Sequence, residues 1–135
     1  MNNNYTFLAT IFSLCVLLPL SGCGGGVKAG GSVSFADGTA VTGGTVVFSD
    51  AQHQYTGAIQ PDGTFQLGGL KPGDGLPPGR YRVAVIEVYE GGAPILDEKY
   101  ESPDRSEISF EVTGGRNEPF SITVERSRTP RAALE

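Results

Sequence analysis

The stretch DGTFQLGGLKPGDGLPPGRYRVAV, residues 62–85, decides the fold class that this sequence indicates. A tight turn opens it, a short strand follows, and a connection rich in glycine and proline leads into a longer strand. In the longer strand Tyr81, Val83 and Val85 alternate inward while Arg80 and Arg82 face water, which is typical of an antiparallel strand with one buried face. The stretch therefore predicts two neighbouring strands of an all-β protein.

Similar alternating segments recur before and after this stretch, and turn dipeptides such as Asp37-Gly38 separate them. Gly57, in the third segment, marks a bulge or a close approach of two backbones. After Val85 the alternation changes phase, which predicts a bulge or the end of the strand. The expected strands are residues 33–35, 45–48, 55–59, 64–67, 81–85, 108–112 and 120–124. Short strands with turns at regular intervals predict a seven-stranded, Ig-like β-sandwich.

The composition agrees with an all-β domain of modest size. The chain has 135 residues, including 20 glycines and 9 prolines, and no segment has the pattern of a long amphipathic helix. Its net charge of −5 argues against nucleic acid as a partner, because nucleic-acid-binding domains carry a basic face. We therefore expect a single β domain that does not bind nucleic acid.

Residues 1–22 carry the pattern of an export signal. Residues 7–18 form an uncharged apolar run, shorter than the roughly 20 residues that a membrane-spanning helix needs. The tetrapeptide LSGC at residues 20–23 matches the bacterial lipobox at each position, so this segment resembles a lipoprotein signal peptide. The resemblance implies cleavage between Gly22 and Cys23 and a diacylglyceryl group on the Cys23 thiol. An uncleaved N-terminal membrane helix is the alternative.

Lipidation would place the protein in the cell envelope. Residues 23–30 would be the lipidated N-terminus and a flexible, glycine-rich tether. Two or three lipid chains on Cys23 are enough for stable attachment to a membrane. Cys15 lies in the segment that would be removed, so the mature chain has no disulfide available. We therefore expect an exported protein on the bacterial cell membrane or the outer membrane, with its domain in the periplasm or at the cell surface.

Three segments resemble one known family: GSVSFADGTAVTGGTVVF at residues 31–48, GAIQPDGTF at residues 57–65 and PGRYRVAV at residues 78–85. They resemble the carboxypeptidase regulatory-like domain, and the resemblance covers residues 27–125. It implies a seven-stranded, transthyretin-like (prealbumin-like) sandwich, here at residues 31–125. It also implies a non-catalytic accessory or binding module, and it brings no catalytic residues to this chain.

The sequence offers little for catalysis. His53 is the only histidine, and neither a nucleophile motif nor a set of further zinc ligands accompanies it. Residues 67–79 are rich in glycine, but no Gly-Lys-Ser/Thr follows them, so a phosphate-binding loop is not expected. We therefore predict no catalytic residues, no metal and no cofactor. A hydrolase with an unrecognised site is a distant alternative.

Residues 91–105 are expected to form a loop, and carboxylates crowd its second half and the residues that follow. These carboxylates are Asp97, Glu98, Glu101, Asp104 and Glu107. A solvated polar loop is the expected outcome, and a Ca²⁺ site within residues 97–107 is the alternative, because the spacing fits no EF-hand.

Two other groups are candidate contact residues. The C-terminal residues 126–135 have no periodicity and are expected to be a flexible tail. Its arginines, which would meet lipid phosphates or an anionic wall polymer, are Arg126, Arg128 and Arg131. The candidates for exposed rings that a carbohydrate would contact are Tyr55, Tyr89 and Tyr100, but nothing else in the sequence supports a carbohydrate role.

The sequence therefore predicts a lipid-anchored envelope protein whose β-sandwich is a structural or binding module and not an enzyme. Its expected partners are the membrane, through Cys23, and an envelope protein or polymer. The alternative is an interaction module that binds a partner protein by pairing with an unprotected edge strand.

Overall fold

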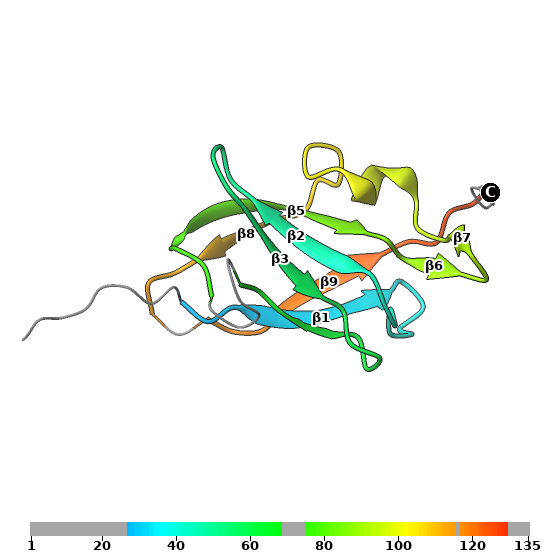
Figure 1. The fold of residues 1–135 in the computed structure, drawn as a ribbon, viewed down its shortest axis with the longest axis horizontal. Helices are drawn as coiled ribbons and strands as arrows, with labels where there is room; N and C mark the ends of the chain where they lie inside the picture. The colour runs from blue at the N-terminus through cyan, green and yellow to red at the C-terminus, as the bar shows by residue number, and fades with distance from the viewer. Residues whose placement is uncertain (1–26, 69–74, 116, 130–135) are drawn as a thin grey trace, which may run out of the picture.

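The structure is a computed structural model, and it describes residues 27–68, 75–115 and 117–129. These residues form nine β-strands and one short 3₁₀ helix (Figure 1). The elements are β1 (Gly30–Phe35), β2 (Thr45–Ser49), β3 (Gln54–Ala58), β4 (Thr64–Gln66), β5 (Gly79–Ile86), β6 (Tyr89–Glu90), β7 (Ala93–Pro94), η1 (Glu98–Glu101), β8 (Ser109–Val112) and β9 (Phe120–Val124).

The strands form two main sheets that pack face to face (Figure 1). One sheet has the order β4-β1-β9, with β1 antiparallel to β4 and parallel to β9. The other has the order β3-β2-β5-β8 and is antiparallel throughout. Strands β6 and β7 make a separate two-stranded ribbon. The prediction of an all-β fold is confirmed.

Each of the seven predicted strand segments coincides with a strand, but the predicted count was too low. The ribbon β6–β7 was missed, and residues 91–105, predicted to be a loop, contain β7 and η1. The phase change after Val85 marks the end of β5 at Ile86, where Glu87 takes a positive φ of 59°. The predicted strand end is therefore confirmed.

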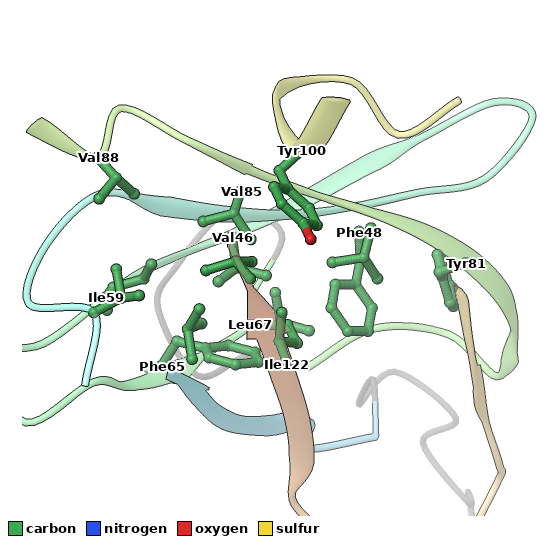
Figure 2. Packing of buried hydrophobic residues seen from close by; sticks show 14 of the residues in the cluster. Val46, Phe48, Ile59, Phe65, Leu67, Tyr81, Val85, Val88, Tyr100 and Ile122 are labelled. Carbon is green, nitrogen blue, oxygen red and sulfur yellow. The ribbon is translucent and has the colours of Figure 1, made fainter. Parts of the chain in front are cut away.

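The core lies between the two main sheets (Figure 2). Figure 2 shows Val46 and Phe48 of β2 pointing toward Phe65 of β4 and Ile122 of β9. Phe48 is fully buried, and its ring lies 5.4–6.4 Å from the rings of four other aromatic residues. Burial of alternate apolar side chains from both sheets is the main stabilising contribution to this fold.

One open side of the sandwich is closed by backbone contact between the sheets. A bridge pairs Thr56, in β3, with Gly68, just after β4, and the Gly68 N–H donates to the Thr56 carbonyl at 3.2 Å. Beside it, a Cβ on Gly57 would lie 2.9 Å from the carbonyl carbon of Gln66, so only glycine fits there. The predicted close backbone approach at Gly57 is confirmed.

The opposite side is closed by residues 95–107 and not by a strand. The register of β5 with β8 ends at Arg82 and Ser109. The next carbonyl of β5, that of Val83, accepts a hydrogen bond from the Ser106 hydroxyl. Tyr100, on η1, inserts its ring into the core and is only 6 % exposed (Figure 2). The prediction that Tyr100 offers an exposed ring was wrong, because the segment folds over the gap between the sheets.

The packed domain extends further at both ends than predicted. Val27 pairs with Leu76 through two hydrogen bonds of 3.0 Å, and Ala29 is buried, so residues 27–30 are not a flexible tether. At the other end Arg126 pairs with Leu96, and the Ser127 N–H donates to the Ile95 carbonyl at 2.8 Å. Arg126 and Ser127 therefore belong to the domain and not to a loose tail.

Two turns share the sequence Asp-Gly-Thr and the same hydrogen bonds. Asp37 accepts from the Thr39 hydroxyl at 2.6 Å and from its N–H at 2.9 Å. Asp62 accepts from the Thr64 hydroxyl at 2.6 Å and from its N–H at 3.0 Å. In each case the hydroxyl, then the N–H, lowers the pKa of the aspartate below its ordinary value, because both bonds favour the charged form.

These turns predict that the domain loses stability in acid. A lowered folded-state pKa means that the charged form stabilises the fold above about pH 4, and that this contribution disappears as the pH falls through the folded-state pKa. We expect the melting temperature of the full chain to fall below about pH 4, and to fall less in Asp62→Asn. Thr64→Ser, which keeps a hydroxyl and an N–H for the two hydrogen bonds to Asp62, should leave the pH dependence unchanged. An equal fall in wild type and Asp62→Asn would contradict the assignment.

Candidate functional site

A concave surface of the described residues lies on the outer face of the four-stranded sheet. It has a volume of about 660 Å³ and is open to solvent. Its lining, called here the arginine site, consists of Ser49, Asp50, Ala51, Gln54, Arg80, Arg82, Pro103, Asp104 and Ser109. The strand register places Gln54, Ser49, Arg82 and Ser109 in one row across β3, β2, β5 and β8. A polar row therefore crosses the whole sheet.

The two arginines of the site differ in their surroundings. Arg82 forms an ion pair with Asp104 at 2.5 Å. Arg80 is exposed, and no carboxylate of the described residues lies within ion-pair distance of it. Glu111 is its cross-strand neighbour on β8, yet the two side chains form no ion pair. Arg80 is thus a cation without an ion-pair partner in the described part of the domain.

Asp50 holds the β2–β3 turn at one end of the site. Its Oδ1 accepts the N–H groups of Gln52 and His53, each at 2.7 Å. These two bonds lower the pKa of Asp50 below its ordinary value. The oxygen that faces the turn is therefore already occupied, and the carboxylate is ionised at neutral pH.

His53 lies in the same turn and is exposed. Its Nδ1 is 3.6 Å from Asp50 Oδ1, and no serine, threonine or cysteine of the described residues donates a hydrogen bond to its ring. An imidazole without a neighbouring nucleophile lacks the arrangement of a hydrolytic triad. His53 therefore lies in a turn, and none of the described residues forms a nucleophile–histidine pair with it.

A smaller cleft of about 160 Å³ lies at the end of the sandwich that carries the β6–β7 ribbon. Its lining, called here the distal cleft, is Phe35, Ala40, Thr42, Gly43, Val88, Tyr89, Glu90, Ile95 and Arg126. The Arg126 guanidinium lies 3.9 Å from the centre of the Phe35 ring and 3.3 Å from Glu90. Cation–π contact and ion pairing hold this arginine in place.

The predicted carboxylate cluster is dispersed. Asp97 caps η1 through the Lys99 N–H, Glu98 pairs with Arg105 at 3.4 Å, and Asp104 pairs with Arg82. Among the described residues no three His, Cys, Asp or Glu side chains are grouped so as to hold a metal ion. The structure therefore does not bring the carboxylates of residues 97–107 together as a Ca²⁺ site.

The three candidate tyrosines also separate. Tyr89 is 57 % exposed on the β6–β7 ribbon, Tyr55 is half-buried with its ring edge-on to Tyr81, and Tyr100 is buried. None of them lines the arginine site. Gly22, Cys23 and Arg131 lie outside the described residues.

Alternation along residues 80–85 predicts that Arg80 and Arg82 face solvent, and both are exposed, but the rest of the site could not be predicted in this way. Ser49, Gln54 and Ser109 gave no motif, because they are single polar residues from three different strands. Their one signal is parity: each occupies a position that alternates with core residues. Only the strand register shows that they are neighbours.

A scan against protein-family models, a search of curated proteins and a search of solved structures each found no match to this chain. The described part of the chain contains no helix with the length and hydrophobicity needed to cross a membrane.

Proposed function

We propose that this chain is a lipid-anchored protein of the bacterial cell envelope, whose non-catalytic β-sandwich acts as a binding module at the membrane surface. The lipobox-like LSGC at residues 20–23 supplies the anchor at Cys23. The observation that carries the proposal is that Val27, only four residues after Cys23, already belongs to the packed domain. Four Cα–Cα steps separate Cys23 from Val27, and they span at most about 14 Å. A lipid on Cys23 would therefore hold the sandwich directly against the membrane.

The shape of the domain supports a role in display. Strand β1 begins at one end of the long axis, and the β6–β7 ribbon lies at the other end (Figure 1). If the end where β1 begins faces the membrane, the distal cleft lies at the end away from the membrane. The arginine site lies on the outer face of the four-stranded sheet. Both concave surfaces stay accessible to a ligand or partner.

We also propose that the sandwich is of the transthyretin-like class, as the resemblance to the carboxypeptidase regulatory-like domain implies. The two main sheets contain three and four strands, which agrees with the seven strands of that class. The same resemblance implies the non-catalytic role, since it brings no catalytic residues to this chain.

The anchor is tested by metabolic labelling with palmitate in a bacterial host, with and without globomycin. We expect the wild-type chain to be labelled and its processing to be blocked by globomycin, because the lipid is attached at the lipobox cysteine. Cys23→Ala should lose all label, whereas Cys15→Ala, which removes the other cysteine, should keep it. A Cys23→Ala chain that is still labelled would show that the anchor lies elsewhere.

One observation favours the alternative, binding by strand addition. Strand β8 is the last strand of its sheet, and the Val83 N–H donates to the Ile108 carbonyl. By alternation the N–H groups of Ser109 and Glu111 then point to the open side. Capture of an envelope protein that is lost in Glu111→Pro, but kept in Glu111→Gln, would favour strand addition. Equal capture by both variants would exclude it.

A further inference from the structure

We propose that the arginine site binds a sugar chain that carries carboxylate groups, with one carboxylate held by Arg80. The inference deepens the proposed binding function, on which it rests, by naming the site and the chemical class of the ligand. It does not depend on the lipid at Cys23, since all the residues involved belong to the packed domain.

The charges of the site favour one carboxylate at Arg80. The guanidinium of Arg80 is exposed and has no ion-pair partner among the described residues. Its planar fork matches the two oxygens of a carboxylate. The two acids that line the site are already engaged, because Asp104 pairs with Arg82 and Asp50 accepts two N–H groups. Arg80 is therefore the group in this site that still needs a counter-charge.

The same acids disfavour a more highly charged ligand. Asp50 and Asp104 line the site with Arg80, and Glu111 is opposite Arg80 on β8. Repulsion from these carboxylates grows with the charge of the ligand, so a doubly charged phosphate is opposed more than a singly charged carboxylate. A ligand with spaced single charges fits this arrangement better.

The rest of the site suits hydroxyl groups. Gln54, Ser49 and Ser109 offer both donors and acceptors, and Asp104 offers acceptors beside them. A sugar hydroxyl can donate to one such group and accept from the next. The row crosses four strands, a distance of about 14 Å at the usual strand spacing, so a short oligosaccharide can lie along it. None of the described residues that line the site is aromatic, so hydrogen bonds and Arg80 carry the recognition.

The Arg82–Asp104 ion pair predicts that loss of the Asp104 charge strengthens binding, whereas loss of the Arg80 charge weakens it. A ligand carboxylate that approaches Arg82 must compete with Asp104. Removing the charge of Asp104 therefore frees Arg82 for the ligand and also removes a repelling group. The site should then bind an acidic sugar more tightly and not less.

The test is calorimetric titration of the full chain, purified in detergent, with oligogalacturonate at low salt. We expect Arg80→Gln to weaken binding about tenfold or more, because a charge-assisted hydrogen bond is lost. Asp104→Asn should tighten binding about threefold. The matched controls are Arg105→Gln and Glu98→Gln, which make the same charge changes in an ion pair outside the site and should leave binding unchanged.

Three outcomes would overturn the inference. They are equal binding of the methyl-esterified oligosaccharide, equal binding of inorganic phosphate, and unchanged binding in Arg80→Gln. If the wild-type chain is labelled on Cys23 but does not bind the oligosaccharide, the ligand class is wrong while the anchor stands. If Cys23→Ala still binds the oligosaccharide but the wild type is not labelled, the anchor is wrong while the site stands.

Discussion

Replacing Phe48 by alanine is expected to lower the free energy of unfolding by about 3–5 kcal/mol. Phe48 is fully buried, and its ring packs against Phe65 and Phe120 from the opposite sheet. Truncation removes these contacts from both sheets at once and leaves a cavity between them. The free energy of unfolding of a native protein is only about 5–15 kcal/mol, so this substitution would remove much of the stability of the domain.

The measurement is denaturant unfolding of the full chain, with the slope of the transition compared between variants. Tyr89→Ala is the matched control, because it also removes an aromatic ring, but from a residue that is 57 % exposed. That change should stay within about 0.5 kcal/mol of the wild type. A loss below about 1 kcal/mol in Phe48→Ala would mean that the ring does not join the two sheets.

The second large effect is expected from Gly31→Ala, which adds a single methyl group. A Cβ at Gly31 would lie 2.7 Å from both the amide nitrogen and the carbonyl carbon of Phe120, and closer still to its carbonyl oxygen. These are backbone atoms of the paired strand β9, which cannot move aside as a side chain can. We expect a loss of about 3 kcal/mol in the free energy of unfolding, because the β1–β9 pair must separate or distort.

Gly115→Ala is the matched control for this glycine. A Cβ at Gly115 meets no atom within 4 Å, and this glycine has no positive φ. The free energy of unfolding of Gly115→Ala should therefore stay within about 0.5 kcal/mol of the wild type. Equal stability of the two variants would show that β1 and β9 are not in contact at Gly31.

The main strands could be predicted from the sequence because alternation is a local signal. Val83 and Val85 are two residues apart, so both side chains point to the same face of β5 and into the core. Glycine within a strand predicts a close backbone approach, and Gly57 lies at one. The ribbon β6–β7 was missed because strands of two residues show no alternation. Tyr100 was misplaced because its burial depends on a gap between the sheets, which only the assembled fold creates.

The arginine site could be predicted only in part, for the same physical reason. The exposure of Arg80 and Arg82 follows from alternation within one strand. The position of Ser49 beside Arg82 depends on the pairing of β2 with β5, and the contact with Asp104 depends on the fold of residues 95–107. Neither the register nor that fold leaves a local pattern in a single sequence.

The parallel pairing of β1 with β9 has a consequence for how the domain folds. The first strand of the sandwich takes its neighbours from β4 and from the last strand, so the three-stranded sheet cannot form until nearly the whole chain is available. Pairing of segments so distant in sequence is slow, because the entropy of closing the loop is lost before the contacts form. An emerging chain would therefore expose β1 until β9 arrives. The three-stranded sheet is therefore completed only when β9 pairs with β1. A chain cut before Phe120 would leave one edge of β1 unpaired.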